Sequence, residues 1–271
     1  MDKNKSLSKD IWSAKALNTA PNSKNQIHGD DMAKEFGFKG GLVPGVTVSA
    51  YLLHPVIEKW GLDWLEKGWA KCKITLPLYD KENFTVYFNE ISENKILSNL
   101  KNTNKIVTAN AEAALLEGIP KAPKIRNDKI AIENYQGPRS SKEIWMKLKK
   151  DGCMAFEYFW GGKNPLIYLR DQNNLPDLLN PSKKGFSNLS FLLGCSNWAL
   201  ASSAYMNPWI HLQTISQNYQ ALPFNSSVIA EIQVNEVFDK KGHEFVDVDV
   251  NLFKQEDKSC IMTINLLSIY K

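Results

Sequence analysis

One histidine and a glycine-rich passage near the N-terminus have the residue types needed to activate water and polarise a carbonyl group. His28 precedes a short charged segment, and the sequence GGLVPG at 40–45 leads from that segment into a long apolar run. The first N–H groups of a helix lack partners within the helix and carry partial positive charge. The N–H of Gly45 could therefore hold a carbonyl oxygen that gains negative charge, and a nearby imidazole could move a proton. Residues 22–46 are the candidate reactive segment.

Two helices are expected to position this segment. Asp30 is a predicted N-cap for a short helix over 31–36, which Gly37 ends. A second helix begins near Gly45 and is apolar on nearly all sides, which is typical of a helix buried on most faces. Gly61 is expected to end it.

The same order of elements occurs twice along the chain. After the first long helix, strands are predicted over 69–78, 84–91, 95–101 and 105–116. A second apolar helix, rich in small residues, is predicted over 190–206, followed by strands over 209–219, 227–238, 244–254 and 258–270. The segment 117–141 between them is polar and contains prolines, as linkers do.

We therefore predict an α+β protein with two domains, 1–125 and 126–271. Each domain would contain one long buried helix wrapped by an antiparallel sheet. The alternative, two packed β-rich domains with incidental helices, leaves the two apolar helices unexplained.

The composition argues against several functional classes. The 33 basic and 29 acidic residues give a net charge of +4, and the lysines are scattered, so no nucleic-acid surface is predicted. The four cysteines lie far apart without neighbouring histidines, which argues against a disulfide framework and a metal site. No apolar stretch reaches the ~20 residues of a membrane span, and residues 1–10 lack the apolar core of a secretory signal. We expect a cytoplasmic protein.

The motifs around His28 resemble the signature of MaoC-like (R)-specific enoyl-CoA hydratases and dehydratases. The resemblance rests on Asn25-x-x-His28, on AKEFGF at 33–38 and on GGLVPG at 40–45, with a looser match at 73–77. It implies a double hot-dog fold. The second half resembles a thioesterase-type hot dog, whose first strand opens with the sequence at 207–211.

The resemblance also implies roles for individual residues. His28 matches the histidine that activates water, and Gly45 matches the glycine whose N–H polarises the thioester carbonyl. The family's aspartate, five positions before the histidine, is replaced by Ser23, and Pro44 replaces a histidine before the glycine. A hydroxyl is no base near neutral pH without an activating partner, so half of the acid–base pair is missing. The candidate substrate-binding residues are Asn25, Gly41, Val46 and His211.

These residues also have purely structural interpretations. His28 could fix the turn before the short helix, and Gly45 could allow close helix packing. His211, beside Trp209 on a predicted strand, is typical of a packing residue. Asp30 or Asp31 could supply the missing carboxylate, although a helix cap is the simpler role.

The resemblance implies a hydratase or dehydratase of fatty-acid metabolism that acts on acyl thioesters of CoA or of acyl carrier protein, without a cofactor. Two alternatives stay open. One is a non-catalytic module that binds acyl-CoA, as Ser23 suggests, and the other is an acyl-CoA thioesterase centred on the second half. Two hot dogs would form a pseudo-dimer within one chain, and a homodimer through the edge strands stays open.

Overall fold

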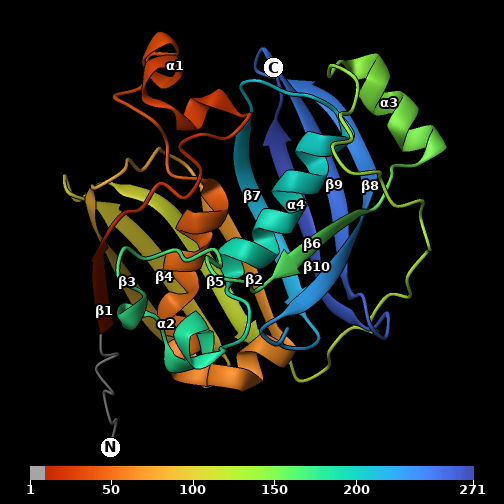
Figure 1. Ribbon diagram of the computed structural model, residues 1–271. Helices are drawn as coiled ribbons and strands as arrows, with labels where there is room; N and C mark the ends of the chain where they lie inside the picture. Colours follow the sequence, from red (N-terminus) through yellow and green to blue (C-terminus); the bar gives the residue numbers. More distant parts are fainter. Residues whose placement is uncertain (1–9) are drawn as a thin grey trace, which may run out of the picture.

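Ten strands form one continuous antiparallel sheet, and two long helices pack against it (Figure 1). The computed structural model describes residues 10–271. Residues 1–9, where the sequence predicts no secretory signal, lie outside that range. The strand order is β1-β3-β4-β5-β2-β7-β10-β9-β8-β6. The strands of the first half therefore lie at one side of the sheet, and those of the second half at the other.

The strands have the following bounds: β1 Asp10–Lys15, β2 Gly68–Ile74, β3 Asn83–Ser92, β4 Lys95–Asn102, β5 Val107–Leu115, β6 Phe156–Trp160, β7 Ile210–Asn218, β8 Ser226–Lys240, β9 His243–Lys254 and β10 Cys260–Ile269. The α-helices are α1 Asp30–Glu35, α2 Gly45–Lys67, α3 Lys142–Asp151 and α4 Leu189–Ser203. Short 3-10 turns are η1 Gln26–His28, η2 Gln172–Asn174, η3 Asp177–Leu179 and η4 Pro181–Lys183. The predicted strands are all present, with some ends shifted.

The two apolar helices, α2 and α4, pack against each other inside the curve of the sheet. Residues 46–57 of α2 are all buried, and most of α4 is buried as well. A helix that is apolar on every side is stable only in such a position. Their first turns meet, because the hydroxyl oxygens of Thr47 and Ser190 are 3.0 Å apart.

The pairing of β2 with β7 joins the two halves. Its register runs from Trp69 opposite Gln217 to Lys73 opposite Gln213. The side chain of Gln217 adds a 3.0 Å bond to the carbonyl oxygen of Lys67. The sheet therefore crosses from one half to the other without a break.

Three details differ from the sequence-based expectations. Gly29, and not Asp30, is the N-cap of α1, because Asp30 turns its carboxylate toward Gly41. Gly61 breaks α2 with a φ of 54°, but the helix resumes and ends only at Lys67. The elements β1, α3 and β6 were not predicted.

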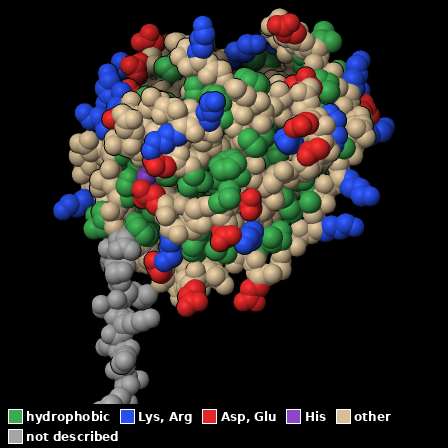
Figure 2. Space-filling model, turned by 60° about the horizontal axis from the view of Figure 1, so that its bottom comes forward, with side chains coloured by type: hydrophobic (Ala, Val, Ile, Leu, Met, Phe, Trp, Pro, Cys, Tyr) green, Lys and Arg blue, Asp and Glu red, His purple; other side chains and the backbone are tan. Residues whose placement is uncertain are grey.

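As its composition predicts, the linker at 117–141 contains no named helix or strand. It is nevertheless anchored, because the buried carboxylate of Glu231 in β8 accepts the backbone N–H groups of Arg126 at 2.8 Å and Asp128 at 3.0 Å. On the face shown in Figure 2, basic and acidic side chains are interspersed. Within the described part of the chain, no helix has both the length and the apolar character needed to cross a membrane.

Candidate active site

His28 ends η1 and is held in one tautomer. Its Nδ1 lies 2.8 Å from the carbonyl oxygen of Leu42. A carbonyl oxygen only accepts hydrogen bonds, so Nδ1 carries the proton and Nε2 of the neutral ring keeps its lone pair. Burial lowers the pKa of His28 below its usual 6.5, and the bond to Leu42 offsets this only in part. His28 is therefore neutral at pH 7, with a basic nitrogen available.

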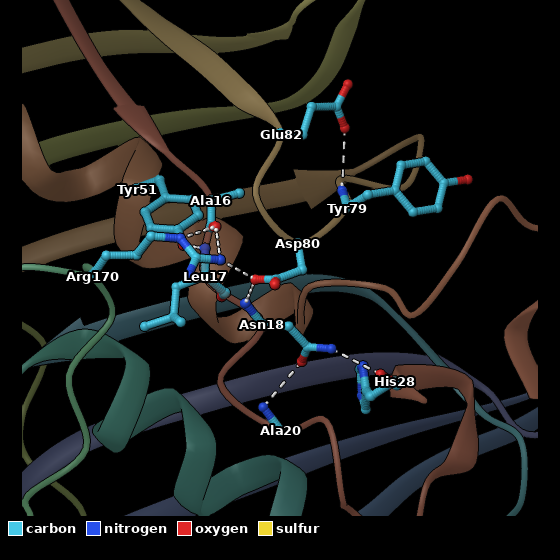
Figure 3. Close-up of polar contacts among 10 residues, drawn as sticks. All are labelled: Ala16, Leu17, Asn18, Ala20, His28, Tyr51, Tyr79, Asp80, Glu82 and Arg170. Carbon is cyan, nitrogen blue, oxygen red and sulfur yellow. Dashed lines mark hydrogen bonds and ion pairs between the residues drawn. The ribbon is translucent and has the colours of Figure 1, made fainter. Parts of the chain in front are cut away.

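A chain of polar contacts fixes the backbone of His28 (Figure 3). The side-chain amide of Asn18 donates to the His28 carbonyl oxygen at 2.8 Å, and the Asn18 N–H donates to Asp80 at 2.8 Å. Arg170, from the second half, pairs with Asp80 and donates twice to the carbonyl oxygen of Ala16. Both halves of the chain thus hold the segment that leads to the imidazole.

Gly41 lies directly against the backbone of η1. A Cβ at Gly41 would lie 2.2 Å from the carbonyl oxygen of His28, so a larger residue would displace η1. The Gly41 N–H donates to Asp30 at 2.8 Å. The Asp30 carboxylate is therefore already bonded to the Gly41 N–H.

Gly45 is the first residue of α2 and lies directly against His211 of β7. A Cβ at Gly45 would lie 2.8 Å from two ring carbons of His211. The Nδ1 of that ring is 3.0 Å from Oδ1 of Asn197 in α4, and its Nε2 is buried without a hydrogen-bond partner in the described chain. Burial, together with the nearby His28, lowers the pKa of His211 to about 3. Two neutral imidazoles therefore lie close to the start of α2.

Asn25 ties the reactive segment to the start of β7. Its side chain donates to the Trp209 carbonyl oxygen at 2.9 Å and accepts the Trp209 N–H at 3.2 Å. Ser23 donates its hydroxyl proton to the Asn25 carbonyl oxygen at 2.9 Å. Ser23 thus stabilises the turn before η1, and these contacts set the position of β7 relative to His28.

Two cavities share His28 in their linings. The smaller, of about 210 Å³, is lined by Asn25, His28, Gly45, Asn197 and His211 and otherwise mainly by apolar side chains, among them Phe38, Val48, Ile74 and Leu76. The larger, of about 680 Å³, is lined by polar residues such as Ser23, Gln26 and Ser190 and by Tyr135, Trp198, Tyr205 and Trp209. Asn25, His28, Asn197 and Trp209 border both. Their combined size is in the range of small-molecule sites.

The residues singled out from the sequence divide by position. Asn25 and His28 line both cavities. Gly45 and His211 line only the smaller, Ser23 and Val46 only the larger, and Gly41 lines neither. Asn197, which borders both cavities, was missed. The available signal was a single amide side chain in a helix made of apolar residues, glycine and serines. Within residues 10–271, no group of three or more His, Cys, Asp or Glu side chains is arranged to hold a metal ion.

Solved structures resemble this chain in fold. Rv0216 from Mycobacterium tuberculosis, described as having a double hot-dog fold, superposes with a TM-score of 0.60 at 6% identity, covering 97% of this chain and 96% of that one. The protein is a double hot dog. No protein-family model and no curated protein sequence matches the chain.

Two further matches carry activity names. The dehydratase domain of RzxB from Pseudomonas fluorescens has a TM-score of 0.55 at 9% identity, covering 96% of this chain and 94% of that one. A protein assigned as thioesterase II from Thermobifida fusca YX also has a TM-score of 0.55 at 9% identity, covering 97% of this chain and 93% of that one. At these identities the likeness extends to the fold and not to the reaction.

Proposed function

We propose that this double hot dog is a hydratase or dehydratase of acyl thioesters carried by CoA or by an acyl carrier protein. One observation carries the proposal. A neutral imidazole with a free basic nitrogen, that of His28, lines the same mainly apolar cavity as Gly45, the first residue of a buried helix. A base and a helix N-terminus at one apolar cavity suit the addition of water to an activated double bond.

In the hydration direction, the carbonyl oxygen of an enoyl thioester accepts the N–H of Gly45. Nε2 of His28 removes a proton from water as the water oxygen bonds to Cβ, and the π electrons move toward the carbonyl oxygen. The helix N-terminus stabilises the resulting enolate. His28 then returns the proton to Cα, so atoms and charge balance. Dehydration runs the same steps in reverse.

The two cavities suggest which part of the substrate binds in each. The smaller cavity suits the acyl chain because its remaining walls are mainly apolar. At about 210 Å³ it is smaller than most drug-sized ligand sites, which favours short acyl chains. The larger cavity, with polar and aromatic walls, suits the amide-containing arm of the carrier.

The test is hydration of crotonyl-CoA, followed by the loss of the enoyl absorbance. His28→Ala should lower kcat by about 10²-fold or more, the usual contribution of a positioned base. His243→Ala is the matched control, since His243 is exposed at the β8–β9 turn. Equal hydration by the wild-type protein and by His28→Ala would refute the assignment.

The same incubation separates the alternatives. Release of free CoA, detected with a thiol reagent, would identify a thioesterase. Binding of acyl-CoA with neither reaction would identify a binding module.

A further inference from the structure

His211 has a buried nitrogen that no protein group satisfies. The residue is 6% exposed, its Nδ1 is bonded to Asn197, and its ring carbons lie against Gly45. The ring therefore cannot turn without losing the Asn197 bond. Its Nε2 has no partner among residues 10–271. Leaving such a buried atom unpaired is unfavourable, so a native protein normally supplies a partner.

The hydrogen bond to Asn197 defines what that partner must be. Oδ1 of Asn197 accepts, so Nδ1 of His211 carries the proton and Nε2 is an acceptor. The missing partner is therefore a donor. His28 is in the same state, with Nδ1 donating and Nε2 accepting, and both rings line the smaller cavity.

We propose that His211 is a second catalytic histidine, whose Nε2 accepts a hydrogen bond from the water that adds to the enoyl thioester. This inference rests on the proposed hydratase function. Two acceptors, His28 and His211, would bind the two hydrogens of one water and leave a lone pair of its oxygen facing Cβ. His28 takes and returns the proton, while His211 stays neutral and changes no bond. His211 thus fills the place of the carboxylate that the resemblance leads one to expect at Ser23.

The groups that could replace the missing carboxylate are either engaged or lie outside both cavities, as the exposed Asp31 does. Ser23 donates to Asn25 and lines the larger cavity, away from Gly45. Asp30 accepts from Gly41. Around His211, the groups from α2 and α4 are the uncharged Gly45 and Asn197, and His28 is the titratable group that acts on it within the described residues.

The first test is His211→Asn, because an asparagine amide can still bond to Asn197 but has no atom at the position of Nε2. We expect kcat for crotonyl-CoA hydration to fall at least about tenfold. Binding of the unreactive butyryl-CoA should be unchanged. The control is His243→Asn at the exposed turn.

The second test is Asn197→Asp, which keeps the side-chain shape and adds a charge. A carboxylate beside Nδ1 favours the protonated ring, so it raises the pKa of His211. The site needs both rings neutral, and a higher pKa means that this form is lost at a higher pH. The acid limb of the rate profile should therefore move upward. The movement should disappear when His211→Asn is added, whereas a carboxylate acting on His28 alone would cause it in both proteins.

The outcomes separate the two proposals. A wild-type protein without hydration overturns the proposed function itself. An active wild-type protein whose rate is unchanged in His211→Asn and whose pH profile is unchanged in Asn197→Asp overturns only the role of His211. A tenfold gain in Ser23→Asp that depends on His28 would also overturn it, because a carboxylate would then have been lacking.

Discussion

Replacing Gly45 by alanine tests the contact on which the site depends. Near the start of a helix, Gly→Ala is normally stabilising by up to about 1 kcal/mol. Here the new Cβ would lie 2.8 Å from Cγ and Cδ2 of His211. Ordinary contact between carbon atoms begins near ~3.5 Å. The ring would have to retreat by roughly 0.7 Å, the difference between the two values.

That retreat has a calculable consequence. The Nδ1 of His211 is 3.0 Å from Asn197, and a shift of that size along the bond brings the pair to about 3.7 Å, beyond hydrogen-bond range. Overpacking of this kind costs about 1–3 kcal/mol, so the sign expected from helix propensity should reverse. With about 2–4 °C per kcal/mol for a chain of this size, the melting temperature should fall by roughly 2–12 °C.

Thermal and urea unfolding measure this directly, with Gly118→Ala as the control. An added Cβ at Gly118 meets no heavy atom within 4 Å, so that variant should stay within about 0.5 kcal/mol of the wild type. Gly45→Ala should also lose most hydration activity. A Gly45→Ala protein as stable as the wild type, or more so, would show that α2 and the imidazole are not in contact.

Three further outcomes are expected. Tyr168→Phe should lower the free energy of unfolding in urea by about 1–3 kcal/mol, because it leaves Nδ1 of the buried His54 without its 2.8 Å partner. The hydration rate should fall with decreasing pH at a midpoint below 6.5, since burial lowers the pKa of His28 and the neutral ring is the active form; a midpoint above 6.5 would contradict this. Glu231→Ala should speed limited proteolysis of the linker by freeing two linker N–H groups, while Glu231→Gln should do so less; equal rates would refute the anchor.

The long apolar helices of the fold could be predicted from the sequence, and the small elements could not. The helices α2 and α4 were predictable because a run that is apolar on all sides has few other stable placements. The five-residue strand β6 and the helix α3 lack such a signal, since Trp145 is the buried residue of α3. The cap of α1 was wrongly predicted because Asp30 finds a better partner in Gly41, which lies outside the helix.

In the candidate site, residues close together in the sequence could be predicted, and contacts between distant residues could not. His28 and Gly45 lie in one short segment, where the motif resemblance identifies them. The contact between Gly45 and His211 spans 211 − 45 = 166 residues and depends on the pairing of β2 with β7 and on the bonds between Asn25 and Trp209. No local pattern encodes such a pairing. Only the structure shows that the two histidines are close and that Asn197 is bonded to His211.

The β2–β7 pairing also determines how the chain should behave if it is cut. Cleavage between residues 118 and 121, before the anchored part of the linker, would leave each fragment with an exposed strand edge that invites aggregation. One fragment would carry His28 and Gly45, and the other Asn197 and His211. Co-expressed fragments that pair β2 with β7 would rebuild the site, so hydration activity in such a split protein would report how many molecules have reassembled.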